Sequence, residues 1–200
     1  MSLINSCARH EPGCEKMNEN IKVLSPMGFG EAVKKGFSNL FNFKGRARRS
    51  EYWWFVLIVA IISIVIGLIF HYTYGAMSVV EVAEHGGTMY ALLTFIASVI
   101  PPLLLVSIQT RRMHDVGKSA LLPMCSFVCS VISAICNCYY NMVSFKSVEN
   151  LVFEPEGASF TIALIFSCVI VVSQLIILVF TLKDSQKMTN SYGESPKYVE

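Results

Sequence analysis

"YWWFVLIVAIISIVIGLIF", from Tyr52 to Phe70, is the stretch of sequence that decides the fold. It contains no charged residue. At about 1.5 Å of rise per residue, a helix of this length spans about 28 Å, close to the thickness of the hydrocarbon core of a bilayer. The stretch lacks the alternation of a barrel strand, and inside lipid a helix is then the way to satisfy its backbone hydrogen bonds. The sequence therefore predicts a transmembrane helix here.

Three further stretches have the same character: "YALLTFIASVIPPLLLVSI", "ALLPMCSFVCSVISAICNCYY" and "FTIALIFSCVIVVSQLIILVFTL". Of all residues, 54% are hydrophobic and only 15% are charged, with a mean hydropathy of +0.53. Soluble domains carry about 25% charged residues. We therefore predict an all-α integral membrane protein with a four-helix transmembrane domain at 44–182, whose spans cover about 52–70, 90–108, 120–140 and 160–182.

The placement of the basic residues predicts how these spans are threaded. Fifteen of the sixteen Lys and Arg residues lie before the first span, between the second and third, or after the fourth; the exception is Lys146. The positive-inside rule then places both termini, including a tail at 183–200, in the cytoplasm. Because "MSLINSCARHEPGCEKMNEN" has no apolar core like that of a signal peptide, we expect the first span to act as the insertion signal.

Two segments precede the first span. Residues 1–24 are polar and without periodicity, and we expect them to be disordered. Residues 25–43 have an apolar face at helical spacing, with Ser25 as a cap and Pro26 in the first turn. The apolar positions are Phe29, Val33, Phe37 and Leu40 or Phe41. This pattern predicts an amphipathic helix that lies in the membrane interface; the alternative is a helix packed on other cytoplasmic parts.

The spans themselves contain few polar residues. Pro101 and Pro102 should kink or break the second span. Such a kink can open a cavity or a hinge; the alternative is that the prolines serve packing alone. Gln174 should find a partner on a neighbouring helix. The third span carries a polar stripe of Ser126, Ser130, Ser133 and Asn137. No acidic or basic residue lies within any span, which argues against a proton-coupled transporter.

"RRMHDVGKSA", residues 111–120, carries more charge than a connector between two spans needs for topology. We expect the arginines near the membrane to form one basic layer at headgroup depth, with Glu51 and Asp115 pairing with some of them. The expected layer consists of Arg46, Arg48, Arg49, Arg111 and Arg112. Arg binds phosphate bidentately, so such a layer suits anionic lipid headgroups or an acidic partner segment.

Three separated motifs together resemble the YhaH-type bacterial inner-membrane proteins, a family classed as domain of unknown function 805. The motifs are "FNFKGRARRSEYWWFVL", "RRMHDVGKS" and "NSYGESPK". The matching residues are Phe43, Gly45, Arg46, Arg49, Glu51, Tyr52 and Trp53, then Arg111, Arg112, His114, Asp115, Gly117 and Ser119, then Asn190, Tyr192 and Gly193. The sequence departs from the family pattern at Ala120, Leu121 and Glu194. The resemblance implies the fold and the bacterial inner membrane, and it supplies no activity.

Several functional hypotheses follow for these motifs. The leading one is an arginine layer that binds anionic headgroups or an acidic partner, and the second is that the motifs only fold the cytoplasmic face. The other two are an interfacial enzyme that uses His114 with Asp115, and an oligomeric pore or transport accessory. The candidate lipid-binding or structural residues are Arg46, Arg48, Arg49, Glu51, Arg111, Arg112, His114, Asp115, Gly117 and Ser119. We expect no metal, cofactor or nucleic acid; the expected partners are membrane lipids, a second copy or another membrane protein.

Overall fold

The computed structural model describes residues 22–84, 86–149 and 157–199, and four long helices dominate them. The elements in chain order are β1 (Lys22–Val23), α2 (Phe29–Ser38), α3 (Arg49–Tyr74), α4 (Val79–Glu84), α5 (Gly87–Asp115), α6 (Leu121–Glu149), α7 (Gly157–Leu182) and β2 (Tyr198–Val199). Helices α3, α5, α6 and α7 are long and apolar enough to cross a membrane. The prediction of four helices long and apolar enough to span a membrane is thereby confirmed, and α4 is a short helix that the sequence did not predict.

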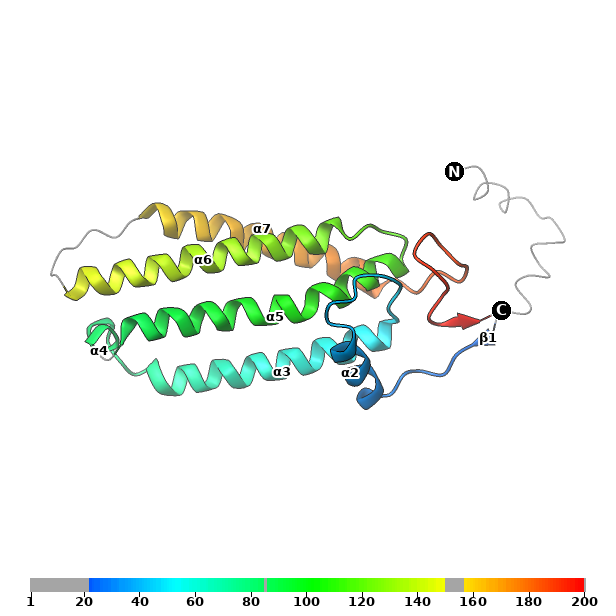
Figure 1. Ribbon diagram of the computed structural model, residues 1–200, viewed down its shortest axis with the longest axis horizontal. Helices are drawn as coiled ribbons and strands as arrows, with labels where there is room; N and C mark the ends of the chain where they lie inside the picture. The colour runs from blue at the N-terminus through cyan, green and yellow to red at the C-terminus, as the bar shows by residue number, and fades with distance from the viewer. Residues whose placement is uncertain (1–21, 85, 150–156, 200) are drawn as a thin grey trace.

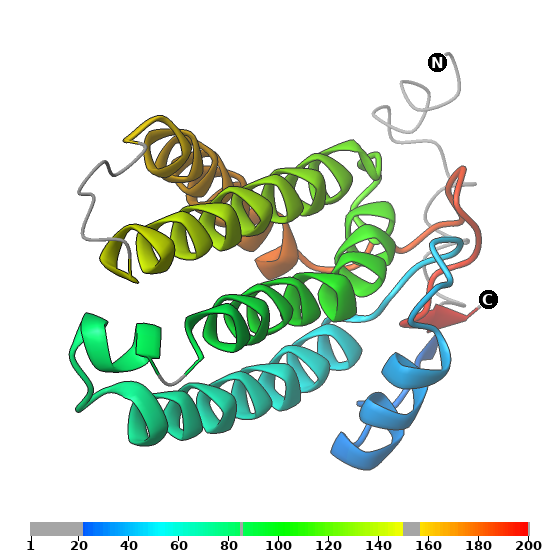
Figure 2. The ribbon, with the colours of Figure 1, turned by 60° about the vertical axis from the view of Figure 1, so that its left-hand side comes forward.

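The long helices pack as neighbours in chain order. Helix α3 lies beside α5, α5 beside α6, and α6 beside α7, so that α3 and α7 are at the outer edges (Figures 1 and 2). We use the name basic end for the end where α3 begins, α5 ends and α7 ends (residues 22–52, 109–122 and 181–199). The opposite end, residues 70–84, 86–94 and 137–146, is the aromatic end. Both β1 and β2 lie at the basic end (Figure 1).

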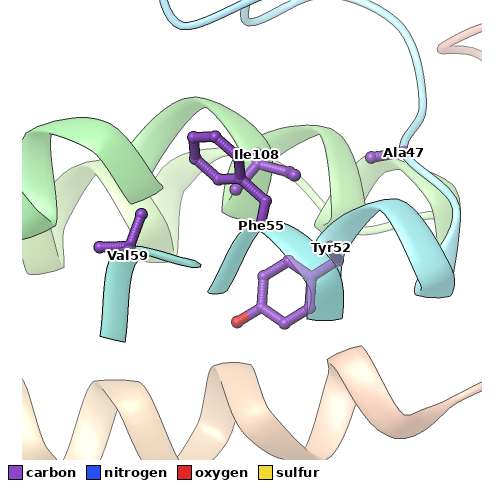
Figure 3. Packing of buried hydrophobic residues seen from close by; sticks show 5 residues of the cluster. All are labelled: Ala47, Tyr52, Phe55, Val59 and Ile108. Carbon is purple, nitrogen blue, oxygen red and sulfur yellow. The ribbon is translucent and has the colours of Figure 1, made fainter. Parts of the chain in front are cut away.

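A small apolar core joins α3 to α5 near the basic end. Phe55 and Ile108 are fully buried in it, between Val59 on one side and Tyr52 and Ala47 on the other (Figure 3). Elsewhere large apolar side chains are exposed on the outer edges of the helix row. Examples are Leu57, Ile64 and Leu68 on α3 and Leu164, Val171 and Val179 on α7. Such an outer surface suits contact with lipid tails, which are as apolar as these side chains.

The helix predicted at 25–43 is shorter than expected. It begins at Phe29 with Gly28 as its N-cap, so the prediction that Ser25 caps it was wrong. The carbonyls of Leu24 and Ser25 instead accept hydrogen bonds from Arg48, at 2.7 and 2.5 Å, which keeps this segment out of the helix.

Helix α2 packs on the first turns of α3. Gly36 permits this contact, because a Cβ at that position would lie 2.1 Å from Cδ2 of Phe55. The rings of Phe29 and Trp54 meet edge to face at 5.5 Å, and those of Phe37 and Phe55 at 5.3 Å. Phe29 and Phe37 are still 45% and 42% exposed. The helix therefore contacts α3 and keeps an exposed apolar face as well.

Helix α5 continues through Pro101 and Pro102 without a break, and Figure 2 shows its last turns running in a different direction from the first. At its other end Gly117 has a φ of +72°, which favours glycine. The Gly117 N–H donates to the carbonyl of His114 and the Lys118 N–H to that of Met113, at 3.0 and 2.9 Å. These are the two bonds of a Schellman motif, so Gly117 ends the helix.

The first and last described segments of the chain meet at the basic end. Lys22 and Val23 pair antiparallel with Val199 and Tyr198, and the Leu24 N–H donates to the Lys197 carbonyl at 2.9 Å. Residues 22–24 belong to the segment for which we expect disorder, and here they pair with the tail, while the fold is otherwise helical as predicted. Two-residue strands carry no periodic signal in a sequence. The rest of the predicted extension, residues 1–21, lies outside the described residues.

Candidate functional site

The three separated sequence motifs converge at the basic end. The segment before α3 lies against the end of α5, where the Ala47 N–H donates to the Arg111 carbonyl at 3.0 Å. The chain after α7 lies against the same helix end, where the Gln186 N–H donates to the Asp115 carbonyl at 3.3 Å. The end of α5 is therefore the common support for the other two motifs.

Arg46 connects all three motifs. Its side chain is 1% exposed, and its Nε and Nη2 atoms lie 3.0 and 2.9 Å from Oδ1 of Asp115. Its Nη1 donates to the carbonyls of Met188 and Gly193, at 3.0 and 3.2 Å, and its Nη2 to that of Gln186 at 2.7 Å. A buried guanidinium is stable only when its charge and its donors are matched in this way. Arg46 thus fixes the course of the tail.

Arg112 fastens the end of α7 to α5. Its Nη1 bonds to Oδ2 of Asp115, so this one carboxylate pairs with two arginines. Its Nη2 donates to the carbonyls of Thr181, at 3.2 Å, and Lys183. The last carbonyls of a helix have no partner within the helix and carry partial negative charge. Arg112 is therefore the cap of α7 as well as an ion-pair partner.

A second buried carboxylate joins α2, α3 and α5. Glu51, which is fully buried in the first turn of α3, lies 2.7 Å from Nη1 of Arg111 on α5. Its other oxygen lies 2.9 Å from Nζ of Lys35 on α2, a side chain that is 39% exposed. The pairing of α2 with α3 therefore combines the apolar contacts of Phe55 with one charged contact.

His114 holds the tail motif in place. Its ring stacks on that of Tyr192, with 3.8 Å between centroids and 4° between planes. Its Nδ1 lies 3.2 Å from the carbonyl of Gly45, and its own carbonyl accepts a bond of 3.0 Å from Nδ2 of Asn190. Asn190 and Gly193 also bond each other through their backbones, closing a turn that presents Tyr192. His114 and Asp115 thus face different partners and do not bond to each other through their side chains.

The remaining predicted residues are arranged differently. Arg48 is buried and donates to backbone carbonyls of the segment before α2, whereas Arg49 is exposed at the start of α3. Gly117 ends α5, and Ser119 is exposed in the loop after it. Of the five arginines expected to form one basic layer, four are buried and one is exposed.

The charged residues of the basic end fall into two groups, a buried interior and an exposed rim. Inside, across the described ranges of the chain, the four buried arginines outnumber the two buried carboxylates, Glu51 and Asp115. Among the described residues, Nε and Nη2 of Arg111 and Nε of Arg112 have no hydrogen-bond partner. Outside, seven cations of the described part of the basic end are exposed; we name six of them, all except Lys22 of β1, the basic rim. The basic rim consists of Lys34, Lys44, Arg49, Lys118, Lys183 and Lys187.

One exposed ion pair holds the final residues of the tail. Nζ of Lys197 donates to Oδ2 of Asp184 at 2.5 Å, and the hydroxyl of Tyr198 donates to the same oxygen at 3.2 Å. The hydrogen bond from Lys197 lowers the pKa of Asp184 below its ordinary value of 3.8. The same bond to Asp184 raises the pKa of Lys197 above 10.5.

The predicted partner of Gln174 lies on neighbouring helices, as expected. Nε2 of Gln174 donates to Oγ of Ser126 on α6 at 2.9 Å, and Nε2 of Gln109 on α5 donates to Oε1 of Gln174 at 3.0 Å. Within residues 22–84, 86–149 and 157–199, no three His, Cys, Asp or Glu side chains are grouped to hold a metal ion.

Sequence reasoning did not find every residue of this arrangement. Lys35 lies outside the apolar face predicted for its helix, yet it pairs with buried Glu51. Gln186 and Met188 take part through their backbone carbonyls, which any residue type could supply. Only the tail motif containing Asn190 and Tyr192 signalled that the tail has a fixed place.

Comparison with known proteins gives a consistent result. Residues 40–194 match the family described as "Protein of unknown function (DUF805)". The inner membrane protein YhaH of Escherichia coli K12 is 34% identical over 107 residues, which cover 52% of this chain and 81% of YhaH. The inner membrane protein YhaI of the same strain is 34% identical over 90 residues, covering 45% of this chain and 65% of YhaI. No solved structure matches the chain.

Proposed function

Since the chain belongs to the DUF805 family and its relatives are inner membrane proteins, we propose that it is an inner-membrane protein whose basic rim binds anionic lipid headgroups. Both termini are cytoplasmic in this proposal, and the basic end faces the cytoplasmic leaflet. The observation that carries it is the contrast between interior and rim: the buried arginines are engaged by carboxylates and carbonyls, while six cations around them remain exposed.

The position of the rim relative to the apolar helices supports lipid as the ligand. Nζ of Lys183 lies 4.9 Å, and Nζ of Lys118 5.4 Å, from the ring centroid of Phe180 near the end of α7. Arg49 begins α3, one helical turn before the aromatic residues Trp53 and Trp54. Lysines and aromatic rings at the end of an apolar helix are typical of the headgroup region. Each basic residue near an anionic surface contributes about 1 kcal/mol of attraction.

The buried pairs have a structural role in this proposal. Asp115 and Glu51 fix the ends of α3, α5 and α7 relative to one another, and so set the depth at which the rim cations stand. The competing function is purely structural: the pairs fold the basic end and the rim binds nothing. These two functions differ in what happens when the rim is neutralised and the interior is left intact.

The test is native mass spectrometry of the whole protein extracted in mild detergent with phosphatidylglycerol and cardiolipin. The variant Lys44→Gln/Arg49→Gln/Lys118→Gln should lose retained anionic lipid, by about fivefold in affinity for each charge removed. The control Lys146→Gln changes one charge at the aromatic end and should retain lipid as the wild type does. The same spectra report the number of copies in the assembly. The proposal includes a homo-oligomer only if the mass of an oligomer with bound lipid is observed.

Equal retention in the rim variant and the wild type would leave the purely structural function. A second outcome is that the rim variant retains lipid as the wild type does but no longer binds an acidic protein segment in a binding assay. That segment would then be the ligand of the rim.

The orientation can be tested on its own. A fluorescent reporter that matures only in the cytoplasm, fused after Glu200, should fluoresce, and an alkaline phosphatase fused there should stay inactive. The opposite pattern would place the basic rim on the outer face and remove the argument from the cytoplasmic leaflet.

A further inference from the structure

A cavity of about 560 Å³ lies between α5, α6 and α7, away from the basic rim. Its polar lining consists of Thr94, Ser98 and Gln109 from α5, Ser130, Ser133 and Asn137 from α6, and Gln174 from α7. Thr94 and Gln109 are fifteen residues apart on one helix, about 22 Å, which is most of the thickness of a bilayer core. The cavity therefore lies at the depth of the lipid tails.

The wall of this cavity offers hydrogen-bond acceptors without charge. The hydroxyls of Thr94, Ser98 and Ser130 each donate to a carbonyl of their own helix, at 2.9, 2.8 and 2.7 Å. Their protons are therefore used, and the lone pairs of their oxygens remain available. No Asp, Glu, Lys or Arg is among the lining residues. A neutral ligand that donates hydrogen bonds fits this chemistry, and an ion does not.

Two amide side chains line the cavity at its end toward the arginines. Gln109 bonds to Gln174, and Gln174 bonds to Ser126, so the two glutamine side chains bridge α5, α7 and α6. Phe95, Pro101 and Leu105 supply apolar surface beside the polar groups. A ligand of mixed character, with an apolar body and a polar group, matches this combination.

Water alone is a poor occupant of this space. At about 30 Å³ for each molecule, the cavity would hold on the order of twenty waters, and each needs two to four polar partners. The seven polar side chains cannot supply so many bonds. An acyl chain alone would fill the volume but leave the oxygens of Thr94, Ser98 and Ser130 facing hydrocarbon, which is unfavourable.

We propose that this cavity binds a neutral, lipid-soluble molecule that carries a hydroxyl group, such as a long-chain alcohol. The hydroxyl donates its proton to the oxygen of Thr94 or of Ser98, and the apolar body lies along Phe95, Pro101 and Leu105. The ligand enters from the bilayer, since the cavity is bounded by the sides of transmembrane helices. This site is independent of headgroup binding at the basic rim.

The test compares two photoreactive probes on the whole protein in lipid nanodiscs. One is a long-chain alcohol with a diazirine in its chain, and the other is the matching alkane without the hydroxyl. Peptide mapping should place the alcohol adducts on the cavity faces of α5 and α6, and excess unlabelled alcohol should displace them. The alkane should label the exposed faces of α3 and α7 without displacement.

Two variants of matched chemistry sharpen the comparison. Thr94→Val/Ser98→Ala removes two cavity acceptors with little change of volume, and alcohol labelling should fall by at least about fivefold. Thr73→Val/Ser63→Ala removes two hydroxyls with the same bonding to their own helix, on α3 and outside the cavity, and should leave labelling unchanged. Both variants should elute and melt like the wild type.

The proposal is overturned if the alcohol and the alkane label the same peptides equally, since the cavity would then be space for acyl chains. It is also overturned if labelling survives in Thr94→Val/Ser98→Ala, or if excess alcohol displaces nothing. Because displacement is measured on the wild type, this result stands even where a variant folds poorly. Loss of lipid headgroup binding at the rim would leave each of these outcomes unchanged.

Discussion

The two ends of the helix row are held together by different kinds of contact. At the basic end, the carboxylate of Asp115 accepts from both Arg46 and Arg112, and most bonds of the buried arginines join residues far apart in the sequence. At the aromatic end, Tyr90 of α5 lies among the rings of α3 and α6. The first end depends on directional, charged bonds, and the second on apolar surface and ring geometry.

This difference predicts how each end responds to substitution. A buried ion pair gives little net stability when intact, because desolvating the charges offsets their attraction, but removing one partner leaves an uncompensated buried charge. Ring contacts have no such penalty, and their loss costs only the contact itself. The basic end should therefore be sensitive to single changes, and the aromatic end tolerant of them.

The largest effect should come from Asp115→Asn. The substitution preserves shape, but it leaves the buried guanidiniums of Arg46 and Arg112 without a carboxylate. We expect the free energy of unfolding to fall by about 3–5 kcal/mol. Chemical unfolding in mild detergent, followed by circular dichroism, measures this change.

Asp184→Asn is the matched control, since the same chemical change falls on a carboxylate that is 50% exposed. Its effect should stay within about 0.5 kcal/mol. If the two substitutions lower the free energy of unfolding equally, the buried ion pairs do not make the basic end more sensitive than the aromatic end.

A smaller effect is expected from Tyr90→Leu. The ring centroid of Tyr90 lies 5.0 Å from that of Tyr74, 5.7 Å from that of Phe145 and 6.3 Å from that of Phe70. Leucine keeps much of the apolar surface but loses the ring geometry, which is worth about 0.5–1.5 kcal/mol for a pair. We expect a loss of about 1 kcal/mol, measured in the same unfolding experiment.

Tyr72→Leu serves as the comparison on the same end, since Tyr72 is 92% exposed and should tolerate the change. A loss at Tyr90 as large as that at Asp115 would mean that the aromatic end is as specifically built as the basic end.

The apolar helices could be predicted from the sequence better than the contacts of the charged residues at the basic end. The four spans follow from length and hydropathy, because a bilayer imposes both on each helix separately. The partner of Arg46 could not be read in this way, since the carbonyls of Gln186 and Met188 become neighbours only once the tail has folded back. The motif that includes His114 signalled a special site, but its spacing did not reveal the stacking on Tyr192.

Burial was the second feature beyond the reach of the sequence. Arginines between apolar spans suggested a layer exposed to headgroups, whereas Arg111 and Arg112 are 3% and 0% exposed. A charge count reports which side of a membrane a residue occupies but not its depth within the protein. For that reason a headgroup-binding test is better made on Arg49 and the lysines of the basic rim than on Arg111 and Arg112.

The smallest effect concerns the exposed pair of Asp184 and Lys197, the weakest contact of the basic end. The pKa of Asp184 is lowered, so its contribution to docking of the tail is present above pH 3.8 and is lost as the pH falls through the lowered value. The pKa of Lys197 is raised, so its contribution is present below pH 10.5 and is lost as the pH rises through the raised value. Between these limits, docking of the tail should not depend on this pair's protonation.

The variant Lys197→Met tests this pair directly. It should move the pKa of Asp184 back toward 3.8, but only in part, because the hydroxyl of Tyr198 still donates to the carboxylate. The measurement is a carboxyl carbon NMR titration of Asp184, with Lys187→Met as a control that removes a nearby exposed lysine. An unchanged pKa would show that Lys197 does not hold Asp184. The tail would then be held by Arg46 and the stacking of Tyr192 on His114, which would concentrate the order of the basic end still further in its buried interior.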